Sequence, residues 1–330
     1  MTLEDVFPDN PCSTTLRYAL STQLPIVIPW AKATVKLGTP FFAPPDKSGK
    51  GTFGDPEKSA FDHQELSSTP LIFSRGSGGG YIETTASSSS SSQERVHADI
   101  SAQIGGSFLG GSGRGQYDSN ASKTAGAIQS SKRVFHQCGR ISLSIFPRLS
   151  EEALHILYTA KEPSQNFSAI FGDYFVAGYL LGAGNVSMIT GAGGSETRSK
   201  ELNIDVEVHL AFISRQEKIH EESLQSTQAA AGTISVYDSL TDEHLQQPVS
   251  DIDQALAVWE ENKARAETLQ QRTAIELSKM RLIVDGSIIP QTRCDELCGS
   301  GLVHELLLFP WTGLRDYTSA ILAPRVFPLS

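Results

Sequence analysis

The chain has 330 residues, in which 27 Lys and Arg face 37 Asp and Glu, so the formal net charge is −10. This excess of negative charge argues against a nucleic-acid-binding protein, because such proteins need surplus cations to displace phosphate counterions. The sequence also lacks a run of about 18 apolar residues, the length that a transmembrane helix requires. We therefore expect no nucleic-acid partner and no membrane-spanning helix.

Cysteine content and the start of the chain limit the class further. Four cysteines are too few for a disulfide-stapled scaffold, and Cys294 with Cys298 is a lone pair without a second pair of ligands nearby. We expect neither a metal nor a cofactor. The first thirty residues contain no basic start followed by a continuous apolar stretch, as a secretory signal would. We expect a soluble protein that is cytoplasmic or non-classically secreted.

The first 126 residues predict strands and one glycine- and serine-rich zone. Residues 1–70 contain short apolar runs between turn-rich stretches, which predict two or three strands. From Gly76 to Gly126 the composition is typical of a linker. Nine residues within this zone nevertheless alternate between apolar and polar, as a half-buried strand does. Their apolar positions are Val96, Ala98, Ile100, Ala102 and Ile104.

The middle of the chain predicts two further strands around a short helix. A strand at 141–145 ends at Pro147, which cannot donate to a ladder. Ser150 is typical of a helix N-cap and acidic residues follow it, so we expect a helix that closes before Pro163. A glycine-rich apolar run covers Phe171 to Gly184, and a clear amphipathic strand comes next. Its apolar positions are Leu202, Ile204, Val206, Val208 and Leu210.

The last third predicts more helices and strands in clusters. Helical patterns cover 216–231 and 251–273, and a short strand at 233–237 lies between them. Apolar runs at 282–284 and 306–308 predict buried strands. Because helices and strands do not alternate regularly along the chain, the sequence predicts an α+β fold.

Catalytic signatures are missing. The glycines at 182–184 and 49–51 fail the dinucleotide and P-loop patterns. The run 110–113 meets Arg114 where a nucleophile elbow needs its last glycine. The eight histidines are scattered, and none forms a His-x-x-x-His pair. We therefore expect no enzymatic activity.

One segment resembles the signature of the membrane attack complex/perforin (MACPF) family. That signature reads aromatic-Gly-Thr-His-aromatic, six residues, Gly-Gly, and the matching run here is Phe171-Gly172-Asp173-Tyr174-Phe175, six residues, then Gly182-Ala183. Asp173, Tyr174 and Ala183 depart from the pattern. The order of segments is also similar to the family: a glycine- and serine-rich amphipathic segment, a strand, a short helix, the signature and a second amphipathic segment.

The resemblance implies a bent, twisted antiparallel sheet flanked by two helical clusters. Family members convert these clusters into transmembrane hairpins, which join neighbouring subunits in a large β-barrel. The MACPF-like domain would cover 71–308, residues 1–70 would add strands and loops to the same domain, and 309–330 would form a tail packed on it. Bending and opening of the sheet would depend on the glycines near the signature, which are Gly172, Gly178, Gly182 and Gly184.

Membrane insertion by this route requires self-association. A barrel strand needs about 9 to 11 residues with one apolar face, which 96–104 and 202–213 offer. Because every backbone group in lipid must be paired, such strands insert only as parts of a closed ring. We expect the chain itself and a lipid membrane as partners. A separate targeting protein, or the tail with Trp311, Tyr317 and Phe327, would select the membrane.

A non-lytic alternative stays open. Charged residues such as Arg114, Asp118 and Lys123 interrupt the first segment, and 216–247 is rich in Gln, Glu and Ser. A charged side chain facing lipid costs about 2 to 4 kcal/mol at mid-bilayer. The leading hypothesis is a pore-forming or membrane-binding protein that oligomerises and is membrane-associated when assembled. The alternative is an intracellular interaction protein with the same fold.

Overall fold

A computed structural model describes residues 22–43, 51–75, 81–86, 112–114, 116–117, 120, 128–190, 232–248 and 252–323. Eleven strands in these ranges form one sheet. The strands are β1 (Ile26–Pro29), β2 (Pro40–Phe42), β3 (Thr52–Phe53), β4 (Leu71–Ser74), β5 (Tyr81–Ala86), β6 (Ile128–Leu143), β7 (Tyr174–Thr190), β8 (Thr233–Asp238), β9 (Glu243–Pro248), β10 (Ile288–Ile289) and β11 (Val303–Pro310). The helices are η1 (Pro56–Lys58), α3 (His63–Ser68), α7 (Glu151–Thr159), α8 (Pro163–Phe171), α10 (Ile252–Glu267), α11 (Leu269–Lys279), η3 (Gln291–Arg293), α12 (Cys294–Gly299), η4 (Trp311–Gly313) and α13 (Arg315–Leu322).

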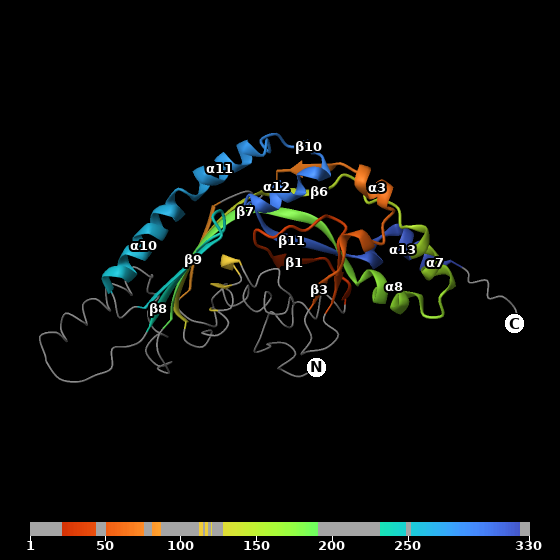
Figure 1. Cartoon of the computed structure of the whole chain (residues 1–330), viewed down its shortest axis with the longest axis horizontal. Coiled ribbons are helices and arrows are strands. Elements are labelled where there is room, and N and C mark those ends of the chain that lie inside the picture. Colours follow the sequence, from red (N-terminus) through yellow and green to blue (C-terminus); the bar gives the residue numbers. More distant parts are fainter. Residues whose placement is uncertain are drawn as a thin grey trace, which may run out of the picture.

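Two long antiparallel strands, β6 and β7, run through the whole sheet. In one half, β7 pairs with β11 and β6 pairs with β4. In the other half, β7 pairs with β8 and β6 pairs with β5. All of these pairings are antiparallel, and Figure 1 shows the sheet bent into an arch with α10 and α11 along its outer side. The α+β class with a large antiparallel sheet is therefore confirmed.

The main core lies in the half of the sheet that carries β11. Phe175 of β7 is fully buried, with its ring 4.9 Å from Phe61 and 4.4 Å from Trp311. Helices α7, α8 and α13 close this end, and the first seventy residues contribute β1, which pairs with β11, and β2, which pairs with β7. Because β7 is covered on both faces, its side chains are buried along nearly the whole strand.

Local signals place some element ends well. Ser150 caps α7, since its hydroxyl accepts a hydrogen bond from the backbone N–H of Ala153 at 3.2 Å. Of the strand expected at 141–145, residues 141–143 form the end of the much longer β6, whereas Ile145 lies beyond it and is 69% exposed. The long helix expected at 251–273 is divided at Thr268 into α10 and α11.

The buried strand expected at 282–284 is wrong. These residues form a loop, in which the side chains of Ile283 and Val284 are 55% and 68% exposed. The carboxylate of Asp285 accepts a hydrogen bond from the N–H of Arg75 at 2.6 Å. This turn brings β10, rather than 282–284, against the edge of β4. Three apolar residues alone do not determine which stretch reaches the sheet.

Most of the expected helical regions lie outside the described residues. These are the helix at 216–231 with the second flanking cluster, and all of the first cluster except a short helical turn at 112–120, which is described in part; Phe327 of the tail also lies outside. Trp311 and Tyr317 of that tail are buried, with 1% and 5% exposure. No helix in the described part of the chain has both the length and the apolar character needed to cross a membrane.

Candidate functional site

The signature segment forms a buried corner between α8 and β7. Gly172 ends α8 with φ +73°, and a methyl group there would lie 2.6 Å from the carbonyl oxygen of Phe41. The carboxylate of Asp173 accepts a hydrogen bond from the N–H of Ala43 at 2.9 Å. The indole N–H of Trp311 donates to the carbonyl oxygen of Phe171 at 3.0 Å. The corner thus joins α8, β2 and the tail to the start of β7.

The aromatic side chains of this corner are core residues. Phe171, Tyr174 and Phe175 are at most 3% exposed. Burial, and to a smaller extent the charge of Asp173, raises the pKa of Tyr174 to about 12. The neutral phenol is therefore the form present at physiological pH. This corner can hold the sheet together, but its buried aromatics offer no surface to a ligand.

The sheet changes partners halfway along β6 and β7. An irregularity between Gln137 and Gly139 interrupts the β6–β7 register, and Gly139 has φ +149°. Across from it, the N–H of Gly182 donates to the carbonyl oxygen of Leu302 at 2.9 Å, and a methyl on Gly182 would lie 2.5 Å from the carbonyl oxygen of His136. Beyond this point β8 replaces β11 beside β7. Close backbone packing marks the transition.

Gly178 and Gly184, the other two glycines expected to allow bending of the sheet, differ in the space around them. A methyl on Gly178 would lie 2.9 Å from the carbonyl oxygen of Ile141, which is too close for an ordinary contact. At Gly184 a methyl would meet only the ring of Phe135, at 3.7 Å. Gly178 therefore lies against backbone, whereas Gly184 has room for a side chain.

Two long parts of the chain begin and end at the same end of the sheet. The first connecting segment, residues 87–127, joins β5 to β6, and the second, residues 191–232, joins β7 to β8. Ile128 of β6 pairs with Thr190 of β7, which pairs with Thr233 of β8. The strands are thus ordered β5-β6-β7-β8, and two segments of nearly equal length start from one end of this four-stranded unit.

The predicted membrane strands belong to these segments. All ten of their apolar positions lie outside the described residues. They are Val96, Ala98, Ile100, Ala102, Ile104, Leu202, Ile204, Val206, Val208 and Leu210.

A polar network attaches α10 and α11 to the outer face of this four-stranded unit. Asn185 of β7 and Asn262 of α10 exchange two side-chain hydrogen bonds, of 2.9 and 2.8 Å. Arg272 of α11 donates to both carboxylate oxygens of Asp238 on β8, at 2.7 and 2.9 Å. Burial raises the pKa of Asp238, but the hydrogen bonds and charge of Arg272 outweigh burial and hold that pKa below its usual value.

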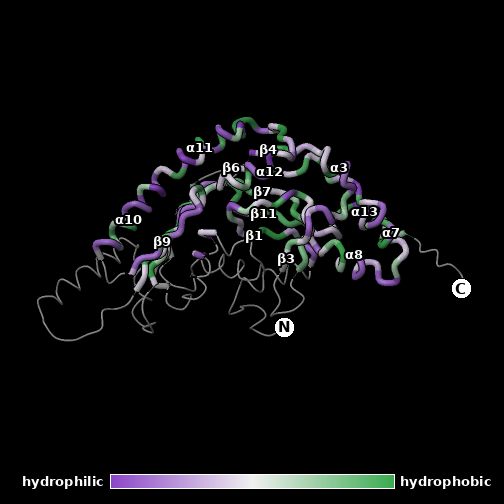
Figure 2. Tube along the Cα trace, viewed as in Figure 1, coloured by the Kyte–Doolittle hydropathy of each residue, from purple (hydrophilic) through white to green (hydrophobic). Residues whose placement is uncertain are grey.

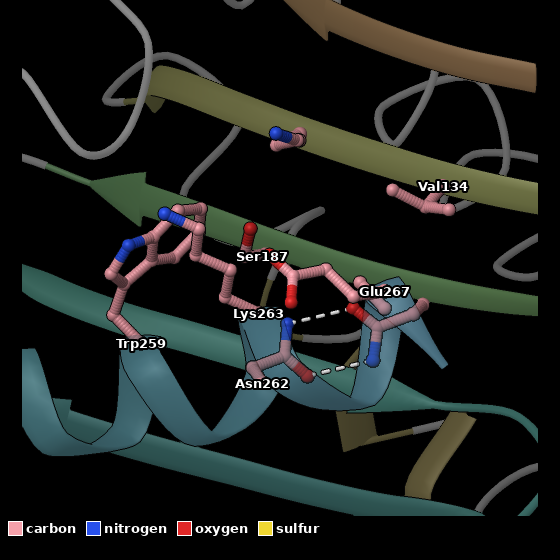
Figure 3. A pocket seen from close by; sticks show the side chains of 9 residues that line it. Val134, Ser187, Trp259, Asn262, Lys263 and Glu267 are labelled. Carbon is pink, nitrogen blue, oxygen red and sulfur yellow. Dashed lines mark hydrogen bonds between the residues drawn. The ribbon is translucent and has the colours of Figure 1, made fainter. Parts of the chain in front are cut away.

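A cavity of about 140 Å³ lies beside this network. Figure 3 shows Trp259, Asn262 and Lys263 projecting from α10 toward the strand that carries Ser187. Trp259 also belongs to an apolar cluster that includes Ile234 of β8. In Figure 2, hydrophilic and hydrophobic residues alternate along α10 and α11. The helices therefore cover the sheet through a mixed interface, part apolar and part hydrogen-bonded.

The described thiols do not form a reactive site. Burial raises the pKa of Cys138 to about 12 and that of Cys298 to about 11, and it also raises the pKa of Cys294. A buried neutral thiol is a poor nucleophile and a poor metal ligand. In the ranges that the structure describes, no three His, Cys, Asp or Glu side chains gather as a metal site would require.

Sequence reasoning did not find the network of Asn185, Asp238, Asn262 and Arg272. One signal was present at Asn185, which interrupts a largely apolar strand, whereas Asp238 is the last residue of β8, a strand of mixed polar and apolar residues. Their partners lie 77 and 34 residues away along the chain, so no local pattern connects them.

Comparison with known proteins identifies no family for this chain. No family model matches it, and no curated protein matches it. Among solved structures, GNIP1Aa from Chromobacterium piscinae is 10% identical to this chain with a TM-score of 0.25. The match covers 91% of this chain and 55% of that one. A structure from Bacteroides thetaiotaomicron, described as a cell invasion protein with a MAC/perforin domain, is 12% identical with a TM-score of 0.28. The match covers 83% of this chain and 64% of that one. The chain thus spans less than two thirds of either structure.

Proposed function

We propose that this chain is a MACPF-like protein that oligomerises on membranes and extends its sheet into lipid through the two connecting segments. The observation that supports this proposal is the common starting end of those segments. Each connects two neighbouring strands of β5-β6-β7-β8, so each can lengthen its strands in the existing antiparallel register. Each is roughly four times the 9 to 11 residues of a barrel strand, which leaves room for two strands and a turn.

Self-association follows from the same physics. In this half of the sheet, β5 and β9 are the outer strands among the residues described. An outer strand presents unpaired backbone groups that another chain can bind. Strands that enter lipid must leave no such edge, so copies of the chain would have to close a ring. The membrane and further copies of the chain are the proposed partners, with a targeting protein as a third. No catalytic role is proposed.

Dye release from liposomes tests the lytic function. The protein is added to liposomes of phosphatidylcholine alone and with phosphatidylserine, and the same samples are imaged by electron microscopy. Leakage accompanied by rings or arcs supports the proposal. Intact liposomes without assemblies at every composition and pH favour the second candidate, a non-lytic interaction protein of the same fold. The polar composition of 216–247 is the observation in favour of that candidate.

A strand-specific variant tests which residues face lipid. Val206→Asp combined with Val208→Asp should abolish leakage, because two carboxylates would face the bilayer. The matched control, Glu207→Gln with His209→Gln, changes the opposite face of the same stretch and should leave leakage intact. Circular dichroism must show that both variants are folded. Equal leakage from the aspartate variant and the control contradicts the assignment of this strand.

A reversible lock tests conversion itself. One cysteine replaces Ala98 and a second is placed on the sheet, so that oxidation ties the first connecting segment down. Leakage should stop in the oxidised protein and return with reductant. Leakage that survives oxidation contradicts conversion of this segment.

A further inference from the structure

A helical turn of the first connecting segment lies on the inner face of the sheet, opposite α10. The described residues of this turn are Ser112, Gly113, Arg114, Gln116 and Tyr117, and Asn120 follows them. The N–H of Gln116 donates to the carbonyl oxygen of Ser112 at 3.1 Å, as in an α-helix. This turn connects β5 with β6 along the chain, yet it packs on β7, β8 and the β8–β9 turn.

Asp242, in the turn between β8 and β9, binds the start of this helical turn. One carboxylate oxygen accepts a hydrogen bond from the N–H of Gly113 and the other from the N–H of Arg114, both at 3.1 Å. The N–H groups of a first helical turn have no partner within the helix, so an external carboxylate satisfies them. The backbones also meet closely, because a methyl on Gly113 would lie 2.0 Å from the carbonyl oxygen of Asp242.

Tyr117 and Asn120 extend the contact along β8. Tyr117 is fully buried, with its ring 6.0 Å from the ring of Tyr237 and 5.9 Å from that of His244. The side-chain amide of Asn120 donates to the hydroxyl of Ser235 at 2.7 Å. The contact therefore includes an apolar anchor as well as the hydrogen bonds to Asp242.

Arg114 extends the contact toward β11. Its side chain is 7% exposed, and its guanidinium carbon lies 5.6 Å from the centre of the Tyr237 ring. Burial raises the pKa of Glu305, but His304, Arg133 and Arg114 together hold that pKa below its usual value. The turn thus supplies part of the positive charge that stabilises a carboxylate on β11.

We propose that the helical turn at 112–120, as far as it is described, is a latch. It holds the first connecting segment to β8, the strand that follows the second connecting segment. The first segment cannot extend β5 and β6 while its middle is bound to β8 and Asp242. Breaking the latch in turn uncovers Ser235 and Tyr237 on β8. Release of the first connecting segment is thereby coupled to loosening of β8, which follows the second connecting segment. What release accomplishes rests on the proposed function, whereas the latch itself can be measured without membranes.

Hydrogen exchange of the full chain in solution tests the latch. Asp242→Asn keeps a residue that tolerates the positive φ of 57° at this position but leaves one acceptor oxygen instead of two. Losing one hydrogen bond and weakening another should speed exchange of the Gly113 and Arg114 amides by roughly 10-fold. Gly113→Ala should have a larger effect, because the added methyl has no space.

The matched control is Gly299→Ala, since a methyl there meets nothing within 4 Å. The control should exchange like the unchanged protein. In both latch variants, amides of β8 should also exchange faster, while those of β11 and β1 stay protected. The proposal is overturned if Gly113 and Arg114 are unprotected in the unchanged protein, or if the variants expose the turn without any change in β8.

Dye release then separates the two claims. If the proposed function holds as well, Asp242→Asn should release dye roughly 10-fold faster than Gly299→Ala, in line with its exchange rate. Faster exchange without any leakage supports the latch and counts against the lytic function alone. Leakage with no change in exchange overturns the latch and leaves the lytic function supported.

Discussion

Replacing Arg272 with methionine should loosen the attachment of α10 and α11 to the sheet. The partner of Arg272 is the carboxylate of Asp238, whose side chain is 1% exposed, while that of Arg272 is 25% exposed. Removing one member of a buried ion pair costs about 3 to 5 kcal/mol, because the other charge stays buried. Asp238 keeps hydrogen bonds from Leu240, Thr241 and Asn185, so we expect the lower end, about 3 kcal/mol.

The measurement is the free energy of unfolding in urea, with the melting temperature as a second readout. A loss of about 3 kcal/mol corresponds to a fall in melting temperature of about 4 °C for a chain of 330 residues, because the unfolding entropy is about 2.1 cal/mol/K per residue. Lys279→Met is the matched control on the same helix. Lys279 is 61% exposed and pairs with Glu276, so its loss should cost about 0.5 kcal/mol or less.

The pH dependence has a defined sign. The folded-state pKa of Asp238 lies below its unfolded value of about 3.9. The stability that this carboxylate contributes is therefore present above about pH 4 and is lost as pH falls through the folded-state pKa. The difference between Arg272→Met and the unchanged protein should accordingly shrink as pH falls toward 4 and below.

A second substitution separates the charge from the packing. Adding Asp238→Asn to Arg272→Met removes the unpaired charge and should recover part of the lost stability. Stabilisation by the Arg272–Asp238 pair is refuted if Arg272→Met destabilises no more than Lys279→Met, or if Asp238→Asn brings no recovery.

Three further predictions concern Gly182, Cys138 and His244. Gly182→Ala should lower the unfolding free energy by about 1 to 3 kcal/mol, because its methyl would lie 2.5 Å from a backbone oxygen, while Gly184→Ala should change it far less; equal effects would contradict this account. Burial raises the pKa of Cys138 to about 12, so its alkylation at pH 8 should require unfolding, and fast labelling of the folded protein would count against this. Burial lowers the pKa of His244 below its unfolded value of about 6.5. The stability that the neutral imidazole contributes is therefore present above about pH 6.5 and is lost as pH falls through the folded-state pKa. Acidification should accordingly destabilise the unchanged protein more than His244→Gln, which urea unfolding at about pH 7.5 and 5.5 would show.

Local sequence patterns determined the kinds of elements. Period-2 alternation and short apolar runs marked parts of β6, β8 and β11, because one buried face is enough to produce them. The hydroxyl of Ser150 and the acidic residues after it marked the start of α7, since capping depends only on residues within one turn. These signals sufficed for the α+β class. They failed at 282–284, where the local run is apolar but β10 occupies the edge of β4.

Tertiary structure alone decided how the elements combine. The strands that flank β7 change where Gly182 packs closely against the backbone of His136, and the attachment of α10 depends on Asn185 and Asn262, which are 77 residues apart. The latch joins Gly113 to Asp242 across 129 residues. Each of these contacts pairs groups whose local sequence is unremarkable, and only the folded chain brings them within hydrogen-bonding distance. The sequence by itself therefore determined the types of strand and helix, while the helix attachment and the latch result from distant pairings that satisfy buried polar groups.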